Sequence, residues 1–212
     1  MNSNKVLSFL SNWSWVLIIV FLTLGWFYPI IGLVAIICML GPVVVAFFRG
    51  RLWCGNICPR GGILDRFFKG MSGNNRIPKI FKNIYFRLAV IALLMGNFAM
   101  GVSKAWPDAA AVGRVFVIII GITTLVAIVL SLFLSRRSWC SFCPMGTMAQ
   151  GAAMFSQYLK RQYHREGCTG CSLCNKACPM GLDPVKDYRT HRDCILCADC
   201  VSACIKDVLS DA

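Results

Sequence analysis

Long uncharged runs of apolar residues fill the first two thirds of the chain. Residues 13–48 contain no charge at all, and a single helix of that length would span about 54 Å, against roughly 30 Å for the hydrocarbon layer of a bilayer. The run therefore predicts two spans with a break at residues 25–29, because Pro29 ends one helix and can start the next. Two further runs, at about residues 86–102 and 115–134, are each long enough to cross once.

Basic residues between these runs predict the orientation of the chain. Segment 49–87 holds nine basic residues and one acidic residue, and segment 136–165 holds five basic residues and no acidic one. The third and fourth runs are separated by a segment with only three charged residues, Lys104, Asp108 and Arg114. Because Lys and Arg concentrate in cytoplasmic loops, we expect a multi-pass protein of the cytoplasmic (inner) membrane, with both termini and everything after residue 136 in the cytoplasm.

The composition excludes several other classes of protein. Hydrophobic residues make up 57% of the chain and charged residues 15%, whereas soluble domains average about 45–50% and about 25%. An ordinary soluble enzyme is therefore disfavoured. The net charge of +13 would by itself suggest nucleic acid. Here the basic residues flank the apolar runs, so we expect the lipid bilayer as partner and no nucleic acid.

An internal repeat follows each predicted pair of spans. Residues 51–61 and 137–146 both contain R-x-W-C and then C-P-x-G, which indicates a duplicated unit of one helical hairpin and one cysteine loop. A pseudo-two-fold arrangement would bring four thiols together at one membrane face: Cys54, Cys58, Cys140 and Cys143. We expect them to hold a third iron–sulfur cluster. A four-thiolate zinc site and metal-free redox thiols are the alternatives.

A second repeat lies in the tail. Its first cysteine run reads C-x2-C-x2-C-x3-C-P, and the second has the same spacing without the final proline. This is the pattern of bacterial ferredoxins with two [4Fe–4S] clusters, in which the fourth cysteine of each run binds the other cluster. The predicted ligands are Cys168, Cys171, Cys174 and Cys204 for cluster 1, and Cys194, Cys197, Cys200 and Cys178 for cluster 2. Structural zinc would leave the third cysteine of each run unexplained.

These patterns define two domains. We expect a membrane all-α domain at residues 1–165, with four transmembrane helices in two pseudo-symmetric hairpins, and a small cytoplasmic α+β ferredoxin-like domain at residues 166–212. Both histidines fall after the last predicted span, so no haem is expected within the membrane. Arg87 and Arg114 are predicted to snorkel at span ends, and Cys38 is predicted to pack inside the second span.

Four arginines lie close to the loop cysteines in the sequence: Arg51, Arg60, Arg136 and Arg137. They should favour the reduced, more negative form of a cluster bound there. For most of them, however, we expect topological anchoring to be the main role.

Two C-P loops after paired spans, followed by the eight tail cysteines, resemble the NapH/NosR-type family of membrane polyferredoxins. The resemblance extends from about Trp13 to Cys204, and it implies electron transfer between the quinone pool and a partner reductase. The chain departs from the family pattern in its second loop, which has two residues between its cysteines instead of three. The external loops are also too short for a flavin domain, so any flavin would belong to a partner.

These observations predict a membrane iron–sulfur electron-transfer protein, a non-catalytic subunit of an oxidoreductase complex. It would relay electrons between a cytoplasmic donor or acceptor and the membrane or a partner membrane redox subunit. The alternative is a maturation or metal-handling factor that reduces or delivers copper through the loop cysteines, since soft thiolates select Cu(I).

Overall fold

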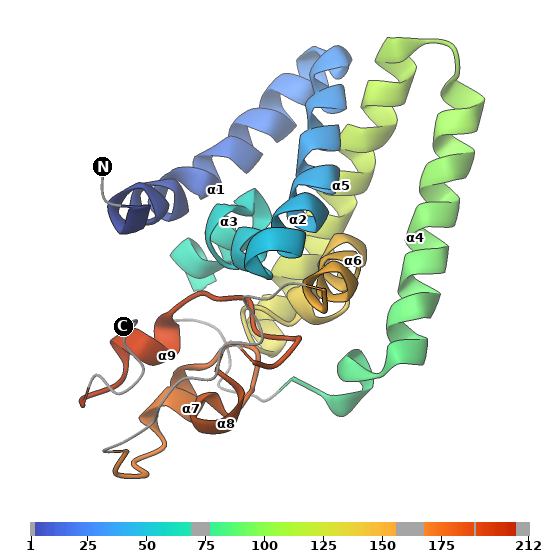
Figure 1. Cartoon of the computed structure of the whole chain (residues 1–212). Coiled ribbons are helices and arrows are strands. Elements are labelled where there is room, and N and C mark those ends of the chain that lie inside the picture. Colours follow the sequence, from blue (N-terminus) through green and yellow to red (C-terminus); the bar gives the residue numbers. More distant parts are fainter. Residues whose placement is uncertain (1–2, 69–76, 156–167, 189, 207–212) are drawn as a thin grey trace.

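The computed structural model describes residues 3–68, 77–155, 168–188 and 190–206, with side chains from residue 13 onward. In that part of the chain the regular structure is helical, and no strand is present. Two helical hairpins form its upper part (Figure 1). The first joins α1 (Ser3–Phe27) to α2 (Ala35–Arg49), and the second joins α4 (Ile84–Ala105) to α5 (Ala109–Phe133).

Local chemistry sets the two hairpin turns. α1 ends at Phe27, and the 3-10 helix η1 (Pro29–Val34) begins at Pro29, so the predicted break in the long apolar run is confirmed. Proline suits this position because its missing N–H would have no helical partner there. In the second hairpin the Asp108 side chain accepts a hydrogen bond from the Ala110 amide at 2.9 Å, which caps the first turn of α5.

Three segments within the described residues are long and apolar enough to cross a membrane: Pro29–Arg49, Ile84–Ala105 and Ala109–Phe133. The apolar part of α1, Trp13–Phe27, is shorter. The second, third and fourth predicted spans are thus supported and the chain is a membrane protein, while the first span stays a prediction. Cys38 is exposed on α2, so its predicted packing is wrong.

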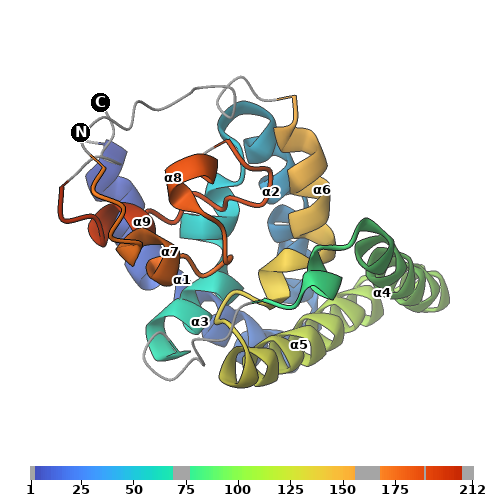
Figure 2. The same ribbon diagram turned by 90° about the horizontal axis from the view of Figure 1, so that it is seen from below.

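Both cysteine loops lie at the end of the hairpins opposite their turns (Figures 1 and 2). The first loop is the short helix η2 (Trp53–Ile57), which continues into α3 (Pro59–Phe68). The second is η4 (Trp139–Ser141), which continues into α6 (Pro144–Ala153). Ahead of α4 lies the 3-10 helix η3 (Lys79–Lys82). The tail contributes α7 (Leu173–Ala177), α8 (Pro184–Asp187) and α9 (Asp199–Ser202), which cover the same end.

The tail shares a hydrophobic core with the membrane part. The buried residues of that core are Ala46, Cys54, Ile77, Ala149, Ala153, Met180 and Ile195. The tail is therefore not packed as an independent unit. The predicted boundary near residue 165 lies outside the described residues.

The α+β class predicted for the tail is wrong for its described part, which holds three short helices and no strand. A strand would have to lie outside the cysteine runs, and between them Pro184 begins the helix α8 instead.

Candidate metal centres

The second cysteine of each loop stands immediately before a helix. Pro59 begins α3 directly after Cys58, and Pro144 begins α6 directly after Cys143. Both cysteines therefore lie at helix N-termini. Unpaired N–H groups and the helix dipole favour negative charge at such positions, which suits thiolates.

The one-residue difference between the loops is absorbed by the helix type. η2 is a π-helical turn and η4 is a 3-10 turn. In both loops the amide of the second cysteine donates to the carbonyl of the tryptophan: Cys58 to Trp53 at 2.8 Å, and Cys143 to Trp139 at 2.9 Å. The extra residue therefore bulges out of the first loop without changing how the two cysteines are framed.

Three loop thiols, those of Cys58, Cys140 and Cys143, lie within electrostatic range of the fourth, Cys54. Burial raises the pKa of the Cys54 thiol to about 12; the nearby charge of Arg51 opposes this rise, while Cys58, Cys140 and Cys143 add to it. The influence of all three thiols on Cys54 means that both loops contribute to one site, which we call the loop site. A thiol as buried as this becomes a ligand only as a thiolate, so a cation must accompany it.

Each loop is held by an arginine from the other loop. Arg51 donates to the carbonyl of Cys140 at 3.0 Å, and Arg137 donates to the carbonyl of Cys54 at 2.8 Å. A Cβ on Gly146 would come within 2.9 Å of the Arg51 guanidinium, and one on Gly61 within 2.1 Å of the Arg137 guanidinium. Glycine in C-P-x-G thus makes room for the crossing arginine, and the two crossings are related by the duplication.

Arg137 is the most strongly held of these cations. It is 1% exposed, forms an ion pair with Asp65 and lies 3.8 Å from the sulfur of Cys140. Burial lowers its pKa, but Asp65 and the cysteines outweigh burial and raise the pKa well above its usual value. Topological anchoring is therefore the wrong interpretation for Arg137 and for Arg51, which is 2% exposed. Both side chains are buried around the loop cysteines.

Two other arginines near the loops have partners of their own. Arg60 donates to the hydroxyls of Thr123 and Thr124 on α5, at 2.8 and 3.1 Å. Arg136 pairs with Asp65 at 3.1 Å and also with Asp199 of the tail. These contacts tie α3, α5 and the tail to the loop region.

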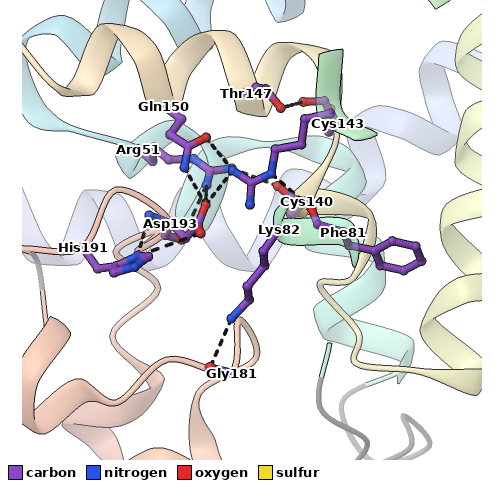
Figure 3. Close-up of polar contacts among 11 residues, drawn as sticks. Arg51, Phe81, Lys82, Cys140, Cys143, Thr147, Gln150, Gly181, His191 and Asp193 are labelled. Atoms are coloured by element: carbon purple, nitrogen blue, oxygen red, sulfur yellow. Dashed lines mark hydrogen bonds and ion pairs between the residues drawn. The ribbon is translucent and has the colours of Figure 1, made fainter. Parts of the chain in front are cut away.

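Arg87 does not snorkel. It is 2% exposed and pairs with Asp193 of the tail at 3.0 Å, and it also donates to the Gln150 side chain at 2.6 Å. Figure 3 shows Gln150, Arg51 and Asp193 converging beside the loop cysteines. The position of Arg87 at a span end suggested lipid contact, but the residue that neutralises it lies more than a hundred positions further along the chain.

The charges around the loop site do not balance among themselves. Five arginines and three aspartates take part in the contacts described, so two positive charges are in excess. These residues are Arg51, Arg60, Arg87, Arg136, Arg137, Asp65, Asp193 and Asp199. Buried charge is costly unless it is paired. Four thiolates around a metal centre leave a net negative charge, so the donor set and its surroundings fit an anionic metal–thiolate group.

Two cavities in the tail bring the remaining eight cysteines into two sets. One cavity is lined by Cys168, Cys171, Cys174 and Cys204, together with Val185 and Lys206. The other is lined by Cys178, Cys194, Cys197 and Cys200, together with Tyr188 and Met180. Each cavity thus draws its fourth cysteine from the other run, as in the crossed assignment.

The pKa values of the tail thiols reflect the same sets. Burial raises the pKa of Cys200 to about 12, and Cys194 and Cys178 add to the rise. The pKa of Cys174 is raised mainly by burial, with smaller contributions from Cys204 and Cys168.

Among the described residues, no group of three or more His, Cys, Asp or Glu side chains is arranged to hold a metal ion. An iron–sulfur cluster is larger than an ion, and it lies between its thiolates with inorganic sulfide completing the coordination of each iron. A cluster therefore suits ligands that line a cavity.

The first loop contacts the tail beside the second cavity. A Cβ on Gly55 would lie only 2.0 Å from the carbonyl oxygen of Ile195. Asn56 donates to the carbonyl of Leu196 at 3.0 Å, and Arg137 is close enough to Cys197 for the two charges to influence each other. The residues that bulge from the first loop thus form the contact between the loop site and the second cavity.

Sequence reasoning missed Gln150 and Asp193 and gave Asp65 no role. A signal was available for Asp65, which is the single acidic residue among the nine basic ones of segment 49–87. Gln150 and Asp193 carry no such signal, because their role depends on how the tail docks.

Helical hairpins, paired cysteine loops and a tail with two cysteine-lined cavities define a class of membrane iron–sulfur proteins. A family profile described as a 4Fe-4S binding domain matches the chain twice, over residues 31–79 and 113–162. Each match contains one cysteine loop and excludes the tail. The predicted duplication is therefore confirmed, and it coincides with the repeated family domain.

Individual relatives point the same way. The chain is 26% identical to the ferredoxin-type protein NapH of Escherichia coli over 183 residues, 79% of this chain and 64% of NapH. It is 27% identical to the methylamine utilization ferredoxin-type protein MauN of Paracoccus denitrificans over 152 residues, 66% of this chain and 54% of MauN. An uncharacterized protein of Methanocaldococcus jannaschii is 27% identical over 187 residues, 84% of this chain and 71% of that protein.

The profile and these relatives support the NapH-type family of membrane polyferredoxins as the family that this chain resembles. It is a membrane protein with a 4Fe–4S binding domain and an electron-transfer role. No solved structure matches it.

Proposed function

We propose that the protein is an electron relay with three iron–sulfur clusters. The ligands of cluster 1 are Cys168, Cys171, Cys174 and Cys204, and those of cluster 2 are Cys178, Cys194, Cys197 and Cys200. The loop site, with Cys54, Cys58, Cys140 and Cys143, holds the third cluster. When bound, such clusters supply one-electron transfer over a wide range of potentials.

The contact between the first loop and the tail carries this proposal. Gly55 lies against the backbone of Ile195, and Asn56 bonds to Leu196. Both tail residues stand between two cysteines that line the second cavity. Protein atoms in contact with each other therefore connect the loop site to that cavity.

Exposure gives the relay two distinct ends. Cys168 and Cys171 are exposed, whereas Cys54 is buried next to the membrane helices. In the proposal, a cytoplasmic redox partner exchanges electrons at the first cavity, and a membrane redox partner exchanges them at the loop site. In the proposal, the chain itself binds, spaces and tunes the clusters, as a non-catalytic subunit of an oxidoreductase complex.

The buried arginines would tune the loop site. Arg137 beside Cys140 and Arg51 beside the second loop place positive charge next to the thiolates. Positive charge stabilises the more negative, reduced form of a cluster. The Lys and Arg distribution supports a cytoplasmic location for this end of the molecule.

Counting iron in anaerobically purified protein tests the proposal. We expect about twelve irons per chain, in three groups of about four. The double substitution Cys54→Ser with Cys140→Ser should remove about four irons and leave the signals of the tail clusters intact. Cys38→Ser is the matched control, since Cys38 is exposed on α2 and belongs to none of the three proposed ligand sets, and it should leave the iron content unchanged.

Other metal contents would change the assignment of the loop site. About eight irons in the parent protein, unaffected by the double substitution, would show that the loop site holds no cluster. Stoichiometric zinc or copper lost with Cys54 and Cys140 would assign the site to that metal instead.

A further inference from the structure

In the second unit a carboxylate of the tail takes the place of an acidic residue that the unit itself lacks. In the first unit Asp65 stands seven positions after Cys58, and the equivalent position in the second unit, seven after Cys143, is Gln150. The preceding residues, Leu64 and Ala149, are both 0% exposed, which confirms that the two helices present equivalent faces. The duplicated units thus differ by one acid.

The acid of the first unit neutralises the arginine that crosses from the second loop, through the ion pair of Asp65 with Arg137. The arginine that crosses in the opposite direction, Arg51, has only an amide at the equivalent position. Its carboxylate partner is instead Asp193 of the tail, at 3.9 Å, and it also donates to the Asp193 carbonyl at 3.5 Å.

Gln150 binds the Asp193 carboxylate directly. Its amide donates to the Asp193 carboxylate at 2.6 Å, and its carbonyl oxygen accepts from Arg87, also at 2.6 Å. Arg87 pairs with the same carboxylate oxygen at 3.0 Å. Figure 3 shows the Gln150 and Arg51 side chains directed at Asp193 from the membrane part of the molecule.

The depth of burial makes this contact consequential. Asp193 is 3% exposed, and Arg51 and Arg87 are 2% exposed each. Without the Asp193 carboxylate, the buried guanidinium groups of Arg51 and Arg87 would both lose an ion-pair partner, and unpaired buried charges are strongly destabilising. Asp193 also directly precedes Cys194, so the contact holds the second cysteine run in place.

We propose that Asp193 supplies the carboxylate that the second repeat lacks, so that the loop site is complete only when the tail is docked. Asp193 and Gln150 are positioning residues: one contact fixes both the charge around the loop site and the place of the second cysteine run. This inference rests on the proposed function for its electrochemical consequence, but not for the docking itself.

The experiment exchanges the acid and the amide. Asp193→Asn removes the charge at constant shape, and Asp193→Asn combined with Gln150→Glu moves the acid to the position that Asp65 occupies in the first unit. Asp108→Asn is the control, because Asp108 is a capping aspartate of the α4–α5 turn, far from the loops.

Two measurements are made on the complete protein. Hydrogen exchange at residues 193–197 should become at least about tenfold faster in Asp193→Asn, because the docked tail loses a buried charge pair. The reduction potential of the loop site, followed by its paramagnetic signal, should rise in the same variant because two arginines lose their counter-charge. The exchanged double variant should restore both towards the parent values, and Asp108→Asn should change neither.

The outcomes separate the two proposals. If the loop site of the parent protein proves to hold no iron, the proposed function fails while hydrogen exchange still reports on docking. Parent-like exchange in Asp193→Asn would overturn the inference, and so would a double variant as impaired as the single one. A single variant that fails to fold while the double variant folds would support it.

Discussion

Gly55 lies directly against the backbone of the tail. Its Cβ, if present, would lie 2.0 Å from the carbonyl oxygen of Ile195 and 3.1 Å from the amide nitrogen of Cys197. Gly55→Ala therefore adds a single methyl group between the loop site and the second cysteine run. The substitution changes no charge and no ligand.

The size of the effect follows from these distances. Non-bonded heavy atoms pack best at about 3.5–4.0 Å, so the first loop and the tail must separate by roughly 1 Å or more. Overpacking of this kind costs about 1–3 kcal/mol. The equilibrium constant for docking of the tail should therefore fall by about fivefold to more than a hundredfold.

Hydrogen exchange of residues 194–200 measures this equilibrium, and spin–spin coupling between the loop site and cluster 2 reports on their separation. Both should change in Gly55→Ala, with faster exchange and weaker coupling, while the iron content stays the same. Gly96→Ala on α4 is the control, because a Cβ there meets nothing within 4 Å. Parent-like exchange and coupling in Gly55→Ala would refute the close contact and, with it, the proposed route between the two sites.

Two further predictions concern the charge and the ligands of the sites. Arg137→Gln should lower the reduction potential of the loop site by about 100 mV, the Coulomb energy of one charge roughly 7 Å away at an effective dielectric constant of about 20. Arg137→Lys should retain most of the parent potential, and equal shifts in both variants would exclude a charge effect. The crossed ligand sets predict that Cys178→Ser combined with Cys197→Ser removes about four irons, whereas Cys178→Ser combined with Cys171→Ser removes about eight. Iron analysis that gave the reverse order would assign each run to its own cluster.

The hairpins and the duplication could be predicted from the sequence because their signals are local. Pro29 marks the break between α1 and η1 within a run that has no charge. The two R-x-W-C and C-P-x-G motifs predicted equivalent loops at one end of the molecule, where the structure has them. Apolar length and proline chemistry set these features whatever the rest of the chain does.

The surroundings of the loop site could not be predicted in the same way. Arg87 looked like a lipid-facing residue because its neighbours are apolar, but its ion pair is with Asp193. Likewise, the sequence shows one more residue between the cysteines of the first loop than of the second, but not where that residue lies. In the structure it forms a π turn that keeps the Cys58–Trp53 hydrogen bond and reaches the tail. Such contacts join segments far apart in the sequence, and no periodicity records them.

Duplication gives each loop an arginine that crosses to its partner, and two equivalent crossings would by themselves make a symmetric pocket. Two differences between the units break this symmetry, and both lie at contacts with the tail. The bulge at Gly55 adds a contact surface that the second loop lacks, and the change from an acid to Gln150 leaves a position that Asp193 fills. Both differences create contacts with the second cysteine run or the residue before it, and neither improves the loop site as an isolated metal site. The asymmetry of the two units is therefore best explained as the means by which a duplicated membrane hairpin holds a tail at a fixed distance from its own thiols.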